Sequence, residues 1–135
     1  MIKAVIFDFF GVLERDGSPN KPLLTYIRTK LKSQYKLGII SNAAADWVAE
    51  ILQKDDVMLF DDIVLSHKIG FAKPESAIYE ISLKNLGVRA EEAIFIDDIE
   101  RYCIAARSLG MKAILYEDLE QATTDLDNLL AVSDN

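Results

Sequence analysis

Polar side chains that could do chemistry stand directly after three apolar runs of Val, Ile and Phe. They are, in chain order, Asp8, Ser41, Asn42, Asp97 and Asp98. Taken singly, Ser, Asn or Asp at such a point is more simply explained as a helix cap. Three carboxylates that gather in one place, however, repel one another and call for a cation among them. Oxygen ligands of this kind suit Mg²⁺, which is typically held by one or two carboxylates, water and phosphate.

The segment Gly70-Phe71-Ala72-Lys73-Pro74-Glu75 adds a cation to this set. Pro74 suits the first turn of a helix, so Lys73 is predicted to lie near a helix N-terminus. A lysine beside the free N–H groups of that N-terminus forms an anion site. A surface lysine in a loop is the commoner explanation for such a residue. The carboxylates expected near Lys73 favour the anion site over a surface lysine.

The hydrophobic pattern predicts the elements that must position these residues. Five apolar runs are continuous rather than alternating, as in strands buried on both faces, and cover residues 2–7, 37–40, 63–65, 93–96 and 113–116. Segments with helical spacing lie at 22–34, 44–54, 74–86, 99–109 and 118–132, with Trp47 expected on a packed stripe. This alternation predicts an α/β fold with helices on both faces of a parallel sheet. Because parallel strands end at one edge, the five polar residues are expected to converge there.

Composition narrows the class of protein. The 135 residues include 15 basic and 22 acidic ones, a net charge of −7, which argues against binding nucleic acid or an anionic membrane. A single cysteine, Cys103, permits no internal disulfide. The apolar stretch ending at Asp8 is far shorter than a membrane span of ~20 residues, so we expect no membrane segment and a cytoplasmic location. One domain is expected over residues 1–132, with 133–135 frayed.

Four motifs together resemble the haloacid dehalogenase-like (HAD) superfamily. The first two are Phe7-Asp8-Phe9-Phe10-Gly11-Val12-Leu13 and Ile40-Ser41-Asn42. The third runs from Phe60-Asp61-Asp62 through Lys73-Pro74-Glu75, and the fourth is Ile94-Phe95-Ile96-Asp97-Asp98 with Ala105 to Met111 behind it. The resemblance spans nearly the whole chain. It implies a Rossmann-like three-layer sandwich whose five-stranded parallel sheet has the order 3-2-1-4-5.

The resemblance also implies a role for each polar residue. Asp8 would be the nucleophile and form an aspartyl-phosphate. The Mg²⁺ ligands would be Asp8, the backbone carbonyl of Phe10, and Asp97 or Asp98. The groups that hold the phosphoryl oxygens as charge develops would be Ser41, the backbone N–H of Asn42, and Lys73. The implied function is that of a Mg²⁺-dependent phosphatase acting on a phosphorylated substrate.

Phe10 departs from the family pattern. Phosphatases of the superfamily usually carry a second Asp two residues after the nucleophile, which protonates the leaving group and then activates water. General acid–base help is worth typically 10²–10⁴-fold, so we expect slow turnover, or turnover only with good leaving groups. Glu14 and Asp16 are candidates to replace the missing acid. Dehalogenases of the superfamily also lack this acid, but the paired Asp97 and Asp98 favour the metal-dependent reaction.

The spacing of the motifs leaves little room for an inserted cap domain. The helix at 22–34 and the strand at 37–40 use most of residues 9–40, and the segment 43–72 is equally full. We therefore expect a capless protein with an open site. Such a site suits a large phosphorylated substrate, or one enclosed by a cap from a second copy of the chain.

Three classes of protein share some of these residues. One is the hydrolase above, another is a regulatory module that keeps the metal and phosphate site without efficient catalysis, and the third is a receiver-type phosphorylation switch. A receiver places its acidic pair after the first strand and its lysine after the last, unlike this chain. The hydrolase and the regulatory module differ only in whether catalysis is efficient with Phe10 in place of the acid.

Overall fold

Five parallel strands form the central sheet of the computed structural model, which describes residues 1–133. They are β1 (Ala4–Phe7), β4 (Lys36–Ser41), β5 (Asp62–Leu65), β6 (Ala93–Asp97) and β7 (Lys112–Leu115). Their spatial order is β5-β4-β1-β6-β7, which is 3-2-1-4-5 when the five are numbered along the chain. The predicted α/β three-layer fold and its strand order are confirmed.

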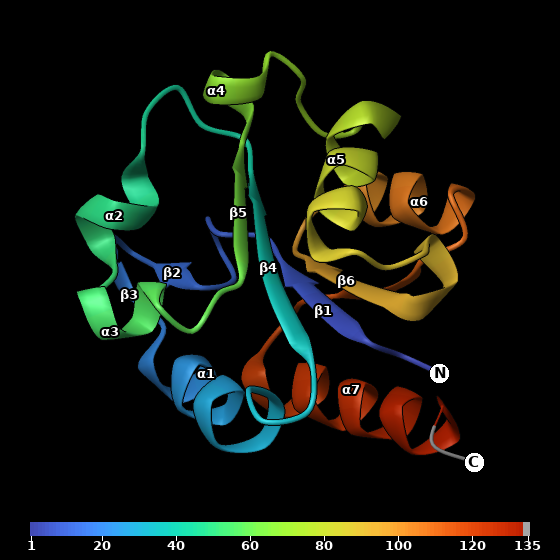
Figure 1. Ribbon diagram of the computed structural model, residues 1–135. Coiled ribbons are helices and arrows are strands. Elements are labelled where there is room, and N and C mark those ends of the chain that lie inside the picture. Colours follow the sequence, from blue (N-terminus) through green and yellow to red (C-terminus); the bar gives the residue numbers. More distant parts are fainter. Residues whose placement is uncertain (134–135) are drawn as a thin grey trace.

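Helices cover both faces of the sheet (Figure 1). One face carries α1 (Lys21–Tyr26), its π-helical continuation Ile27–Leu31, and α7 (Leu119–Ser133). The other carries α5 (Ser76–Leu86) and α6 (Glu100–Ser108). Val5 and Phe7 of β1 pack into the first core, and Ala4 and Ile6 pack into the second. A strand covered on both sides buries every residue, which explains its unbroken apolar run.

Strand register places the candidate residues at one edge of the sheet. Phe7 lies opposite Ile39 of β4 and Ile96 of β6, so the three strands end nearly level. The backbone N–H of Asp8 donates to the carbonyl of Ile96 at 2.8 Å, which continues the ladder one residue beyond β1. Asp8 and Asp97 therefore emerge on neighbouring parallel strands, at the point where the strand order changes direction.

The helix predicted over 44–54 is confirmed only at Trp47–Ile51. The chain forms two short helices instead, α2 (Trp47–Ile51) and α3 (Lys54–Val57). Asp46 caps α2 by accepting a hydrogen bond from the backbone N–H of Ala49 at 3.2 Å, and Leu52 is extended. Trp47, expected to pack, is 47% exposed, because Val48 is the residue of this turn that enters the core.

Several short elements were not anticipated. A hairpin of β2 (Glu14–Arg15) and β3 (Ser18–Pro19) follows β1, α4 (Ser66–Ile69) follows β5, and a 3₁₀ turn spans Ala90–Glu92. The helix expected from Pro74 begins at Ser76, because Glu75 at its N-cap is still extended. Of the expected frayed end, Ser133 belongs to α7, and 134–135 lie outside the described residues.

Between β1 and β4, and between β4 and β5, residues 1–133 hold only this hairpin and the short helices. A capless protein with an open site therefore remains an expectation. Among the described residues, no helix combines the length and apolar character needed to cross a bilayer.

Candidate active site

Three carboxylates meet at the carboxyl edge of the sheet. One oxygen from each of Asp8, Asp97 and Asp98 lies within 4.8 Å of the others. Asp8 is 6% exposed and Asp97 is fully buried, whereas Asp98 faces solvent. The predicted convergence of strand ends therefore places two acids deep in the site and one at its mouth.

Lys73 joins the two buried carboxylates. Its Nζ lies 2.6 Å from Asp8 Oδ1 and 2.8 Å from Asp97 Oδ2, and only 3% of the residue is exposed. Lys73 lies three residues before the start of α5, near the helix N-terminus as expected, and its ammonium points into the carboxylates; its role in binding an anion stays a prediction. A buried charge needs partners of opposite sign, and Lys73 has two.

Burial controls the protonation of the two inner carboxyls. It raises the pKa of Asp8 to about 8, with Lys73 acting in the opposite direction and Asp97 and Asp98 adding to the rise. Burial also raises the pKa of Asp97, against the lowering effect of Lys73. Both shifts favour the protonated carboxyl unless further positive charge lies beside the two residues.

The donor set fits Mg²⁺. Three carboxylates against one ammonium leave two formal negative charges, which one divalent cation would balance, and every candidate ligand atom is an oxygen. Asp98 makes no ion pair with any residue of the described chain. These residues are therefore suited to hold the ion, and their role as its ligands remains a prediction.

Asn42 fixes the strand end against the Lys73 loop. Its Oδ1 accepts from the backbone N–H of Lys73 and its Nδ2 donates to the carbonyl of Lys73, both at 2.9 Å. A reciprocal pair of this kind holds the main chain of the lysine, so that the ammonium enters the site in one place. Asn42 therefore joins two strand-end loops and is not a helix cap.

Ser41 is a further buried polar residue of the sequence motifs. It is 1% exposed, and its Oγ has no hydrogen-bond partner among the described residues. A buried hydroxyl without a partner costs free energy, and a phosphoryl oxygen would supply one. The side chain does not line the open cavity beside Asp8, so its phosphate-binding role stays a prediction.

An open cavity of about 310 Å³ lies over the carboxylates. Its lining residues are Asp8, Phe10, Gly11, Asn42, Lys73, Asp98, Ile99 and Tyr102. Phe10 is 36% exposed there, and its ring meets that of buried Phe9 edge to face at 5.1 Å between centroids. The position of the missing acid is thus an apolar part of the cavity wall.

Neither Glu14 nor Asp16 lines this cavity. The Glu14 carboxylate accepts from the backbone N–H groups of Gly11 and Gly17, at 3.2 and 2.6 Å, and so holds the hairpin loop together. Asp16 lies in the exposed hairpin turn with a φ of 55°. The suggestion that one of them replaces the missing acid therefore finds no support in their positions.

Gly11 and Tyr102 are cavity residues that pattern reasoning missed. Gly11 has a φ of 83°, and a Cβ built on it would overlap the Asp98 carboxylate. Tyr102 follows the fourth motif on α6, and its hydroxyl contacts Asn42, 60 positions earlier. The close spacing of Gly11 to Asp8 is a signal that could have found the first; no local pattern marks the second.

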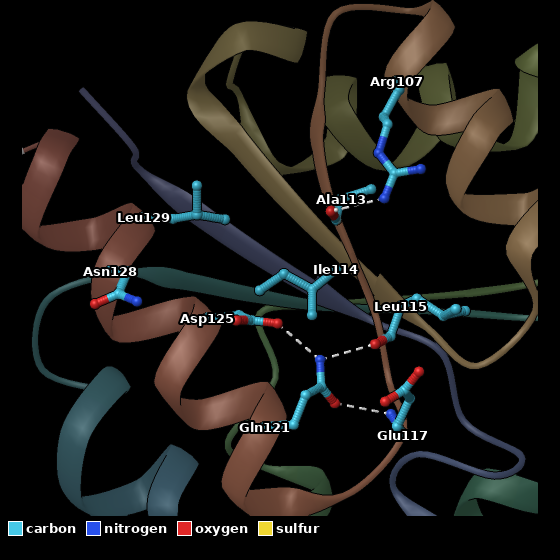
Figure 2. Close-up of a pocket in the computed structure, with 9 residues that line it drawn as sticks. All are labelled: Arg107, Ala113, Ile114, Leu115, Glu117, Gln121, Asp125, Asn128 and Leu129. Atoms are coloured by element: carbon cyan, nitrogen blue, oxygen red, sulfur yellow. Dashed lines mark hydrogen bonds between the residues drawn. The ribbon is translucent and has the colours of Figure 1, made fainter.

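A larger cavity than the one over the carboxylates lies beside the edge strand β7 (Figure 2). Its volume is about 500 Å³, and it opens between Arg107 of α6 and the side chains of α7. Arg107 donates to the carbonyl of Ala113 at 3.1 Å, and Gln121 donates to that of Leu115 at 3.0 Å. These contacts close the strand edge, and none of the candidate catalytic residues lies here.

The family model for haloacid dehalogenase-like hydrolases matches residues 22–116, which hold Ser41, Lys73 and Asp97 but not Asp8. The chain belongs to the haloacid dehalogenase-like hydrolase family. The resemblance noted from the four motifs is thereby confirmed.

Two curated relatives illustrate the range of the family. Bifunctional epoxide hydrolase 2 of Sus scrofa is 30% identical over 118 residues, 84% of this chain and 21% of that protein. Glyceraldehyde 3-phosphate phosphatase of Methanothermobacter thermautotrophicus is 31% identical over 109 residues, 77% of this chain and 48% of that protein. The chain thus spans between a fifth and a half of the length of these relatives.

Two solved structures share the fold over most of their length. An uncharacterized protein from Corynebacterium glutamicum has a TM-score of 0.85 at 20% identity, covering 97% of this chain and 96% of that one. A HAD family enzyme from Bacteroides thetaiotaomicron, in complex with magnesium and inorganic phosphate, has a TM-score of 0.73 at 19% identity, covering 87% and 95%.

Proposed function

We propose that this protein is a Mg²⁺-dependent phosphomonoester hydrolase that works through Asp8. The observation that carries the proposal is the Asp8 carboxylate held 2.6 Å from the Lys73 ammonium, beside Asp97 and Asp98 at the mouth of an open cavity. A related glyceraldehyde 3-phosphate phosphatase, and a structural neighbour in complex with magnesium and phosphate, support the same class of reaction.

The proposed reaction has two steps. A free Asp8 oxygen attacks phosphorus, the bond to the leaving oxygen breaks, and an aspartyl-phosphate forms. Water then attacks the same phosphorus, which releases inorganic phosphate and restores the Asp8 carboxylate. Lys73, the Ser41 hydroxyl and the backbone N–H of Asn42 hold the phosphoryl oxygens while charge moves onto the leaving oxygen. Mg²⁺ held by Asp8, the Phe10 carbonyl and Asp97 or Asp98 would supply further charge stabilisation.

The decisive experiment is hydrolysis of 4-nitrophenyl phosphate with and without Mg²⁺, by wild type, Asp8→Asn and Phe10→Asp. We expect slow wild-type hydrolysis that needs Mg²⁺ and disappears in Asp8→Asn. A panel of small phosphate esters and phosphorylated proteins extends the assay. The open site favours the larger substrates. Chemical cross-linking of the active fraction tests the alternative, in which a second copy of the chain covers the site.

A catalytically degenerate metal- and phosphate-binding module is the second candidate function. The observation that favours it is Phe10, whose ring stands in the cavity where the superfamily phosphatases place an acid. Hydrolysis that appears only in Phe10→Asp, together with Mg²⁺ binding by the wild type, would replace the enzyme by this module. Absence of both hydrolysis and Mg²⁺ binding from all variants would overturn both candidates.

A dehalogenase reaction ranks below them because it needs no paired Asp97 and Asp98.

A further inference from the structure

The Tyr102 hydroxyl stands at the cavity wall between two hydrogen-bond donors. The residue is 9% exposed and lines the same cavity as Asp8 and Lys73. Asn42 Nδ2 lies 3.3 Å from its Oη, and Arg101 Nη2 lies 3.1 Å from it. The Lys73 ammonium is 5.1 Å from the centre of its ring, so the phenol adjoins the ion pair of the site.

The directions of these two bonds are fixed. The Asn42 amide cannot be turned around, because its oxygen accepts from the backbone N–H of Lys73 while its nitrogen donates to the carbonyl of that residue. An arginine guanidinium has donors and no acceptor. Tyr102 Oη therefore accepts both bonds, and its own proton is used by neither. Within residues 1–133, the Tyr102 hydroxyl donates no hydrogen bond.

We propose that Tyr102 is a catalytic residue, whose O–H donates its proton to the leaving-group oxygen of a phosphomonoester. The inference rests on the proposed function and extends it. A phenol proton without a protein acceptor, in a cavity that also holds the nucleophile, is available to a substrate oxygen. It supplies a proton that the Phe10 side chain cannot. Asn42 and Arg101 stabilise the negative charge that the transfer leaves on the tyrosine oxygen.

The proton is returned in the second step. As Asp8 attacks phosphorus and the bond to the leaving oxygen breaks, the Tyr102 proton moves to that oxygen, which leaves as an alcohol. The tyrosine oxygen then takes a proton from the water that attacks the aspartyl-phosphate. Inorganic phosphate departs, and both Asp8 and Tyr102 return to their starting states.

The test compares two kinds of leaving group in Tyr102→Phe. An alkyl phosphate needs a proton on its departing oxygen, whereas 4-nitrophenolate departs without one. We expect Tyr102→Phe to lower kcat/KM for an alkyl phosphomonoester by about 10²-fold, within the usual range for an acid catalyst, and for 4-nitrophenyl phosphate by less than about threefold. Tyr79→Phe is the matched control, because the Tyr79 hydroxyl donates to the backbone carbonyl of Tyr102 at 2.8 Å and is buried away from the cavity.

The outcomes separate this inference from the function on which it rests. Equal losses on both substrates in Tyr102→Phe, as a structural role would give, overturn the inference and leave the hydrolase proposal standing. Wild-type protein that hydrolyses neither substrate overturns both. Wild type alone gives a second measurement: D₂O should slow the alkyl ester more than the aryl ester, and equal slowing would contradict the proposed proton transfer.

Discussion

Phe10 and Phe9 show how neighbouring residues divide their tasks at the first strand end. Phe9 is fully buried beneath the site and belongs to the core shared with α1 and α7, whereas Phe10 reaches the cavity. Because the exposed ring contributes little to that core, Phe10→Asp is a substitution the fold should tolerate. The chemistry at this position is therefore separable from stability.

Gly11 gives a prediction at the same scale. Gly11→Ala places a methyl group where the Asp98 carboxylate lies, so we expect Mg²⁺ affinity to fall at least tenfold, measured by titration calorimetry. The positive φ of 83° adds a loss of about 1–2 kcal/mol in the free energy of unfolding.

Gly17→Ala is the control for Gly11→Ala. Gly17 has a φ of 82°, but a Cβ there would meet nothing within 4 Å. Both variants should lose similar stability, and only Gly11→Ala should lose Mg²⁺ affinity. Equal affinities in the two variants would remove Asp98 from the metal site.

Among the secondary-structure elements, strands followed from the sequence more readily than helices. Burial on both faces leaves a continuous run such as Ile94-Phe95-Ile96, and a run of that kind needs no distant partner to be recognised. The β2–β3 hairpin depends instead on one side chain, Glu14, that bonds two backbone N–H groups. Tertiary contacts of this type leave no periodic signal.

The candidate site also contains residues that the sequence predicts and contacts that it does not. Asp8 and Asp97 were predictable as neighbours because the strand order fixes which ends adjoin. The Tyr102 hydroxyl and its proton depend on the orientation of the Asn42 amide, which the Lys73 backbone sets from another loop. The packing expected for Trp47 is wrong because Val48, and not Trp47, is the residue of this turn that enters the core.

Glu92 links two elements and carries a pH prediction. Its carboxylate accepts from the backbone N–H of Arg89 at 2.9 Å and pairs with Lys3 at 2.9 Å, just before β1 and β6 begin side by side. The Arg89 N–H, followed by Lys3, lowers the pKa of Glu92 from 4.5 to about 2. A lowered pKa in the folded state stabilises the fold above pH 4.5, and the stabilisation disappears as pH falls towards 2.

We therefore expect wild type to be more stable than Glu92→Gln at pH 7 and to lose that advantage between about pH 4.5 and 2, in urea unfolding at each pH. Glu91→Gln, an exposed neighbour, should show a smaller and flatter difference. A constant gap between wild type and Glu92→Gln across this range would contradict the assignment.

For the molecule as a whole, the uncompensated carboxylates predict that Mg²⁺ stabilises the fold. A ligand that binds only the folded state at 100 times its Kd raises the free energy of unfolding by about 2.7 kcal/mol. We expect a gain of this size on adding Mg²⁺ to protein stripped with EDTA, followed by chemical denaturation. The gain should shrink in Asp98→Asn and persist in Glu50→Gln, which alters an exposed acid of α2. An undiminished gain in Asp98→Asn would place the ion elsewhere.

The closed edge of β7 bears on how this protein behaves when it is concentrated. Arg107 and Gln121 already occupy the carbonyl oxygens of Ala113 and Leu115 that a foreign extended peptide would need. An incoming strand must first displace the Arg107 guanidinium and the Gln121 amide from these carbonyls. A strand edge without such side chains would offer its backbone groups directly for pairing. We therefore expect these two side chains to hinder sheet-to-sheet pairing between crowded molecules along this margin, and with it the growth of fibrils.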